Sequence, residues 1–224
     1  MRGGSLIIPA YFDPQREAAD WSMVVAGAGA VRLAIINPSN GPGPVRQDRY
    51  ADQVARLGEV GICTVGYVNT AYGERSLADV REECAALRDW YGVDGVFFDQ
   101  VSSDIGGITA YERYVGEARA LGCRTVVLNP GVYPHWAYLN LANLVVTFEG
   151  TAAAHEGVDV PAWARALPAR RFGHLVYDVP LNQVGDVRRR VVAANVGATY
   201  ITDGVTPNPW GRLTRHWDLL GESR

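Results

Sequence analysis

The sequence predicts a single (β/α)8 barrel over residues 1–224, and three observations support this fold class. Short apolar runs rich in β-branched residues recur along the chain, amphipathic stretches separate them, and no segment has the composition of a linker or a low-complexity tract. This alternation is typical of βα units around a parallel sheet. A chain of 224 residues is long enough for one barrel of this type, although a small one.

Each expected strand is an apolar run that ends in polar or turn-forming residues. The runs span residues 6–11, 32–36, 62–67, 95–98, 125–128, 144–148, 172–177 and 199–202. Helices are expected over 46–57, 77–91, 111–121 and 184–195, and in the third an apolar face is formed by Tyr111, Tyr114, Val115, Ala118 and Leu121. An open, doubly wound sheet is the alternative, disfavoured because no GxGxxG or Walker loop follows an early strand.

The overall charge is mildly acidic, at −3 with a pI near 5.8. We therefore expect no nucleic-acid partner, because such proteins carry a concentrated basic face, and Arg188–Arg190 is interpreted as a solvated helix face. No apolar run approaches the length of a membrane span, so no membrane partner is expected. The N-terminus MRGGSLIIPAYFDP has no signal-like apolar stretch, so we expect a cytoplasmic protein unless the chain is a trimmed form of a secreted one.

Several reaction classes are excluded or disfavoured by residue usage. The chain contains no lysine, so a Schiff-base mechanism is excluded. The three cysteines are far apart, and the four histidines show neither an HxH nor an HExxH spacing, so we expect neither a metal nor a cofactor. A GxSxG nucleophile elbow is also missing.

The residues at the ends of the expected strands are polar and aromatic, and in a (β/α)8 barrel these ends build the active site. They are Tyr11, Asp13, Asn37, Tyr67, Asn69, Tyr72, Asp99, Gln100, Asn129, Glu149, Tyr177, Asp178 and Asp203. If Phe97 and Thr147 point into the barrel, strand alternation directs Asp99 and Glu149 to its mouth. Tyrosine rings stack on sugars, and paired carboxylates cleave glycosidic bonds, so the pattern favours carbohydrate chemistry.

Spacing alone leaves alternatives open for the acidic residues. An Asp at a strand end also caps the following helix, so Asp99 fits either role, and Asp13, Asp178 and Asp203 are equally ambiguous. For Glu149 a functional role is favoured over helix capping, because Glu is a poor N-cap and this residue follows an apolar run.

Six motifs carry a resemblance to a known family: IIPAYFDP at 7–14, INPSNGPG at 36–43, VGYVNTAYGER at 65–75, WYGVDGVFFDQ at 90–100, VVLNPG at 126–131 and VVTFEG at 145–150. Together they resemble the spherulin-4 family. The resemblance implies a (β/α)8 glycoside hydrolase acting on α-1,4-linked galactosamine or N-acetylgalactosamine polymers. Asp99 would then be the nucleophile or transition-state stabiliser, and Glu149 the general acid/base.

The same resemblance implies roles for other positions. Tyr11, Asn37, Tyr67, Asn129 and Tyr177 would line the sugar subsites. Arg75 either clamps a strand-end carboxylate or forms a structural salt bridge. An acidic mouth would suit a partly deacetylated, cationic polysaccharide or oligosaccharide.

One position departs from the family pattern, because Gln100 stands where a Glu usually follows the strand-4 Asp. An amide cannot exchange a proton at neutral pH. Three hypotheses result: a hydrolase using Asp99 and Glu149, with retention favoured; a catalytically silent carbohydrate-binding protein; and, ranked last, a barrel isomerase of a phosphorylated metabolite. The sequence does not predict the oligomeric state.

Overall fold

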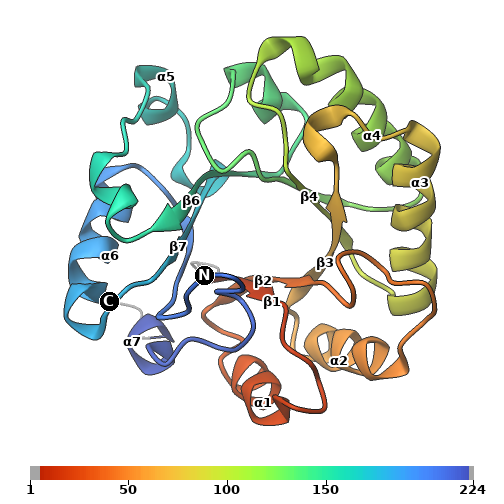
Figure 1. Cartoon of the computed structure of the whole chain (residues 1–224), viewed down its shortest axis with the longest axis horizontal. Helices are drawn as coiled ribbons and strands as arrows, with labels where there is room; N and C mark the ends of the chain where they lie inside the picture. Colours follow the sequence, from red (N-terminus) through yellow and green to blue (C-terminus); the bar gives the residue numbers. More distant parts are fainter. Residues whose placement is uncertain (1–5, 222–224) are drawn as a thin grey trace.

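The computed structural model describes residues 6–221 and is a closed barrel of eight parallel strands in sequential order (Figure 1). The strands are β1 (Leu6–Ala10), β2 (Val31–Ile36), β3 (Cys63–Asn69), β4 (Gly95–Asp99), β5 (Thr125–Leu128), β6 (Leu144–Thr151), β7 (Phe172–Tyr177) and β8 (Ala198–Ile201). The predicted fold class is confirmed. The expected cytoplasmic localisation was based on the N-terminal sequence, and residues 1–5 of that sequence lie outside the described residues.

The predicted apolar runs coincide with the eight strands, with differences only at the ends. β3 continues to Asn69 and β6 to Thr151. Tyr67 and Glu149 are therefore strand residues whose backbone is held by neighbouring strands, and not the first residues of loops.

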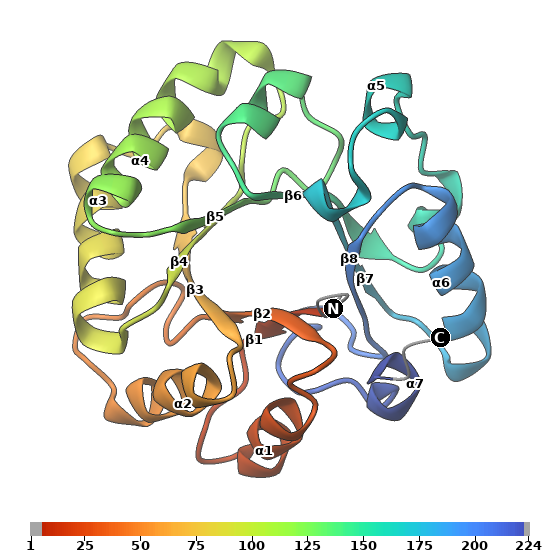
Figure 2. The same cartoon turned by 180° about the vertical axis from the view of Figure 1, so that it is seen from behind.

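Helices surround the barrel, as both views show (Figures 1 and 2). They are α1 (Ala18–Ala26), α2 (Asp48–Glu59), α3 (Leu77–Ala86), α4 (Ile108–Ala120), α5 (Ala162–Arg165), α6 (Val184–Ala193) and α7 (Trp217–Gly221). A π-helical segment, η2 (Leu87–Tyr91), continues α3, so the predicted helix 77–91 is α3 and η2 together. The 3-10 segments are η1 (Ala71–Gly73), η3 (Ile105–Gly107), η4 (Trp136–Asn140), η5 (Ala154–Gly157), η6 (Ala169–Arg171) and η7 (Leu181–Gln183).

Apolar residues at helical spacing attach these helices to the barrel. α2 buries Tyr50, Val54 and Leu57, which lie on one face, and α4 buries the predicted residues Tyr111 to Ala118 of its apolar face. Within residues 6–221, no helix combines the length and apolar character needed to cross a membrane.

The sheet departs from a regular parallel ladder in three places, one of which is a register shift between β1 and β2 at Leu6 and Ile7. The register between β6 and β7 shifts between Val146 and Phe148, directly before Glu149, and such bulges redirect the side chains that come after them. The seam between β1 and β8 is short: among the described residues only Leu6 pairs with Thr199, whereas β1 pairs with β2 from Leu6 to Ala10.

Candidate active site

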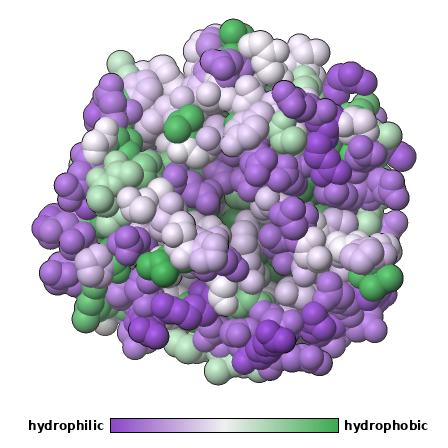
Figure 3. Space-filling view, viewed as in Figure 1, coloured by the Kyte–Doolittle hydropathy of each residue, from purple (hydrophilic) through white to green (hydrophobic). Residues whose placement is uncertain are grey.

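A cavity of about 520 Å³ opens at the C-terminal ends of the strands, within the range typical of small-ligand sites. The space-filling view shows a hollow near the centre of this face (Figure 3). The lining residues come from six strand ends and from the loop after β8. They are Tyr11, Asn37, Asn40, Tyr67, Asp99, Glu149, Leu175, Tyr177, Thr206, Pro207, Asn208, Pro209 and Trp210.

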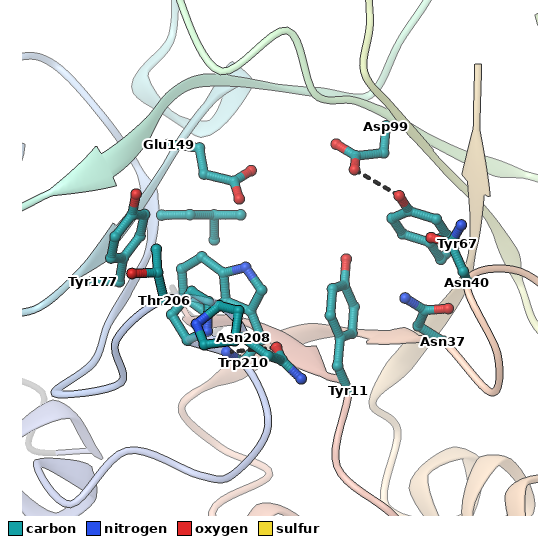
Figure 4. Close-up of a pocket in the computed structure, with 13 residues that line it drawn as sticks. Tyr11, Asn37, Asn40, Tyr67, Asp99, Glu149, Tyr177, Thr206, Asn208 and Trp210 are labelled. Atoms are coloured by element: carbon teal, nitrogen blue, oxygen red, sulfur yellow. Dashed lines mark hydrogen bonds between the residues drawn. The ribbon is translucent and has the colours of Figure 1, made fainter. Parts of the chain in front are cut away.

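Two carboxylates, Asp99 of β4 and Glu149 of β6, project into this cavity (Figure 4). The side-chain amide of Asn129 connects them. The buried Asn129 donates through Nδ2 to Asp99 Oδ1 at 2.7 Å and to Glu149 Oε2 at 2.5 Å. The distance between Asp99 Oδ1 and Glu149 Oε2 therefore cannot exceed the combined length of these two hydrogen bonds. The hydroxyl of Tyr67 donates to the other oxygen of Asp99 at 2.8 Å.

The two carboxyl groups have different surroundings. Burial and the neighbouring Asp99 raise the pKa of Glu149 to about 7, although hydrogen bonds from Asn129 and Trp210 act in the opposite direction. A carboxyl group with a pKa near neutrality can both donate and accept a proton at ordinary pH. Asp99 instead accepts two hydrogen bonds, from Tyr67 and Asn129.

Tyrosine and tryptophan rings form the walls of the cavity. Tyr11 packs edge-on against Tyr67, with ring centroids 5.7 Å apart, and Tyr177 packs edge-on against Trp210 at 5.8 Å. Burial and the charges of Asp99 and Glu149 raise the pKa of Tyr11, so its hydroxyl stays protonated and neutral. Such walls can hold the apolar face of a sugar ring while their hydroxyl groups donate hydrogen bonds.

Four predicted residues besides the two carboxylates line the cavity: Tyr11, Asn37, Tyr67 and Tyr177. Asn129, directly after β5, contacts both carboxylates. The structure thus brings together seven of the predicted side chains, because each lies at or just after the end of a parallel strand.

Asp13 and Asn69 hold loops and do not line the cavity. Asp13 accepts hydrogen bonds from the backbone of Gln15 and Arg16 and pairs with Arg49 at 3.2 Å. Asn69 accepts a hydrogen bond from the Ala71 amide at 2.7 Å.

Arg75 does not clamp a strand-end carboxylate. It pairs with Glu83 of α3 at 2.8 Å and donates to the carbonyl of Asn69, because the turn after β3 directs it toward that helix. This is the structural salt bridge that the sequence left as the alternative.

Tyr72, Gln100 and Asp178 share an unusual backbone conformation and also lie outside the cavity lining. Their φ angles are 58°, 50° and 54°, in the left-handed region, and all three side chains are exposed. The Gln100 carbonyl accepts a hydrogen bond from the Tyr72 amide at 2.7 Å. The position where the chain departs from the family pattern is therefore an exposed turn residue.

Asp203 anchors the loop that comes after β8. Arg212 donates to both of its oxygens, at 3.2 and 2.7 Å, and the Arg215 amide donates at 3.0 Å. Burial opposes ionisation of Asp203, but these hydrogen bonds outweigh it, and its pKa lies below the usual range. Asp203 does not line the cavity; it holds the loop that does.

The sequence reasoning missed Asn40, Leu175 and the whole segment from Thr206 to Trp210. The segment lies after β8, so its position at a strand's C-terminal end was an available signal. Its composition, TPNPW, combines turn residues with a large aromatic side chain. Asn40 lies in NPSNGPG, where the glycines and prolines suggested only a loop-shaping role.

Comparison with known proteins gives the family of this chain. The model of the family described as "Spherulation-specific family 4" matches residues 5–222. The chain belongs to this family. Spherulin-4 of Physarum polycephalum is 28% identical over 213 residues, covering 89% of this chain and 63% of the relative, so the chain spans less than two thirds of that protein.

Solved structures share the barrel of this family member. Sph3 of Aspergillus clavatus, crystallised in complex with GalNAc, has a TM-score of 0.81 at 21% identity, over 99% of this chain and 98% of that one. A chitinase from Rhizomucor miehei has a TM-score of 0.55 at 8% identity and covers 99% of both chains. At these identities the likeness shows a common (β/α)8 fold.

Proposed function

We propose that this protein is a glycoside hydrolase that cleaves α-1,4-linked polymers of galactosamine or N-acetylgalactosamine. The observation that carries the proposal is the pair Asp99 and Glu149, which project into one aromatic cavity and share the amide of Asn129. Membership of the spherulation-specific family and the likeness to a protein crystallised with GalNAc support the substrate class.

The environments of the two carboxyl groups support a division of roles. Glu149, with a pKa near 7, holds the proton that the departing glycosidic oxygen needs. Asp99, which accepts hydrogen bonds from Tyr67 and Asn129, attacks or stabilises the anomeric carbon. Glu149 then removes a proton from the water that completes the reaction.

The short distance between the carboxyl groups supports retention of configuration. Retaining enzymes place their carboxyl groups about 5–5.5 Å apart, whereas inverting enzymes leave about 6.5–9.5 Å for a water molecule. The nearest oxygens of Asp99 and Glu149 are limited by two hydrogen bonds of 2.7 and 2.5 Å to one nitrogen. That limit falls at the separation typical of retaining enzymes and below that of inverting enzymes.

The exposed position of Gln100 supports an enzyme over a silent sugar-binding protein. Its side chain is not part of the cavity lining, so the amide at this position removes no carboxylate from the cavity. Catalysis by the Asp99 and Glu149 pair does not require a carboxyl group there.

The test is incubation with partly deacetylated α-1,4-linked galactosamine polymer while reducing ends are counted. We expect Asp99→Asn and Glu149→Gln each to lose at least about 100-fold in rate. Asp178→Asn, which neutralises an exposed carboxylate after β7, and Gln100→Glu serve as controls and should retain activity. NMR of the first product gives the anomeric configuration.

A catalytically silent carbohydrate-binding protein is the second hypothesis. It predicts that the parent protein binds the polymer without releasing reducing ends. That result, or full activity in the Glu149→Gln variant, would contradict the proposed hydrolase.

A further inference from the structure

A second groove of about 660 Å³ lies beside the cavity that holds the two carboxylates. It runs between the loop after β2 and the helical segment formed by α3 and η2. Asn40 lines both the cavity and this groove. The cavity and the groove therefore adjoin at Asn40.

The loop that forms one wall of the groove is held firmly on the helix. Tyr91 donates a hydrogen bond to the Pro42 carbonyl at 2.7 Å, and the Gly41 amide donates to Asn37 at 2.9 Å. Gly41 has a φ of 134°, and a Cβ there would lie 3.3 Å from Glu83 Oε2. Only glycine fits this backbone and lets the Glu83 carboxylate approach so closely.

The groove carries an excess of negative charge. Its charged lining consists of Arg75, Asp79, Glu82 and Glu83. Glu83 neutralises Arg75 through their 2.8 Å ion pair, while Asp79 and Glu82 are exposed and have no ion-pair partner among the described residues. Glu83 Oε2 is buried without a hydrogen-bond partner in residues 6–221. Two uncompensated carboxylates thus face the groove, and they attract cations.

An aromatic surface accompanies these charges. Trp90 of η2 is partly buried against the core and lines the groove, with Pro42 and Pro44 in the same lining. An indole face binds the apolar face of a sugar ring and attracts an adjacent ammonium group. The groove thus combines a stacking surface with carboxylates, which matches an amino sugar whose nitrogen carries no acetyl group.

We propose that this groove is a distal subsite that binds the ammonium groups of unacetylated galactosamine units in the same polymer chain. It selects partly deacetylated chains over fully acetylated ones, and it acts only on chains long enough to pass Asn40. This inference rests on the proposed hydrolase function, since it names the chemistry of the substrate outside the cleavage point.

The experiment compares the parent protein with Asp79→Asn/Glu82→Gln and with Trp90→Ala. A matched control, Glu112→Gln/Asp218→Asn, removes two exposed carboxylates from α4 and α7, which do not line the groove. Rates are measured on long partly deacetylated polymer, long fully acetylated polymer and short acetylated oligomers. Affinities for the same ligands are measured in a Glu149→Gln background.

We expect the Asp79/Glu82 double variant to lose about three- to tenfold in kcat/KM on long partly deacetylated polymer, and to be unchanged on the other two substrates. The loss should shrink at high salt, because exposed charges are screened. Trp90→Ala should weaken binding of both long polymers and leave the short oligomers unaffected.

Equal activity of all variants on every substrate would overturn the distal subsite and leave the hydrolase standing. Absence of cleavage by the parent protein would overturn the hydrolase. In that case the binding measurements still decide the role of the groove: unchanged affinity in the Asp79/Glu82 variant overturns it, and a selective loss for partly deacetylated polymer supports it.

Discussion

Asn129 is the residue on which the geometry of the carboxylate pair depends. Its single amide nitrogen has two protons and donates one to each acid, which keeps Asp99 and Glu149 close despite their mutual repulsion. The amide also acts on protonation, since its hydrogen bond favours the ionised form of Glu149 and lowers the pKa of that group.

Replacement of Asn129 by alanine should therefore move the pH dependence of the reaction as well as its rate. Loss of the hydrogen bond raises the pKa of Glu149, so the alkaline limb of the kcat/KM profile, expected near pH 7, shifts to higher pH. The measurement is kcat/KM from about pH 5 to about pH 9, on either side of that limb. An unchanged alkaline limb would show that Asn129 does not tune Glu149.

The raised pKa of Glu149 should also affect the stability of the fold. Its folded pKa of about 7 lies above the ordinary value of 4.5, so folding becomes less favourable as the pH rises between these values. Glu149→Gln should therefore raise the free energy of unfolding at about pH 8 by about 3 kcal/mol and leave it nearly unchanged at about pH 4. Urea denaturation at both pH values tests this, and equal gains at both would contradict it.

Among the elements, the loop after β8 differs most from what the sequence suggested. It carries Trp210 into the cavity, and its path is fixed by contacts within the loop and with α1. Asp203 binds Arg212 and the Arg215 amide, and the Leu213 amide donates to Asp20 of α1 at 2.8 Å. The loop is therefore a rigid wall that depends on a few polar anchors.

Asp203→Ala should free the loop after β8 from its contacts with Arg212 and the Arg215 amide. The variant leaves Arg212 without its bidentate partner, and we expect a loss of about 1–3 kcal/mol in stability together with a lower affinity for sugar ligands. The control is Asp186→Ala, which removes an exposed ion pair with Arg189 on α6 and should change stability by less than about 1 kcal/mol. Thermal unfolding and sugar titration of both variants provide the comparison, and equal effects would contradict an anchoring role.

These elements also show what can be predicted from sequence. Apolar runs located all eight strands, and strand ends in a parallel barrel converge, so Tyr11, Asp99, Asn129 and Glu149 were identified together. Trp210 was not, although it follows β8, because the path of its loop is set by polar contacts of Asp203 and Asp20 that show no periodicity in the sequence. Asp203 and Arg75 were identified as candidate site residues. The structure shows that each forms an ion pair, Asp203 with Arg212 and Arg75 with Glu83, and that neither lines the cavity.

For the molecule as a whole, the buried histidine pair should control stability in acid. His155 Nε2 and His174 Nδ1 share a hydrogen bond of 2.9 Å beside Phe148, and both rings are buried. Burial lowers the pKa of His155 to about 4 and that of His174 to about 3. Both rings bind protons more readily in the unfolded chain, so stability falls as the pH drops below about 6.5.

Each imidazole ring should make the free energy of unfolding fall by up to about 1.4 kcal/mol per pH unit as the pH drops from about 6 to about 4. A His155→Gln/His174→Asn double variant should be less stable at neutral pH but should show a flatter dependence on pH. His135→Gln, which lies outside the pair, is the control and should keep the parent slope. The free energy of unfolding across a series of pH values gives these slopes, and parallel curves for all three proteins would contradict the role of the pair.

The short seam between β1 and β8 has a consequence for how the barrel opens. Most neighbouring strands pair over several residues, but among the described residues the ladder between β1 and β8 consists of the single pair Leu6 and Thr199. Spontaneous local opening should start where the ladder is thinnest. Amide protons of β8 should therefore exchange with deuterated solvent before those of β3 and β4. A covalent crosslink between β1 and β8 should slow the opening of the barrel at this seam and therefore slow the exchange of the β8 amides.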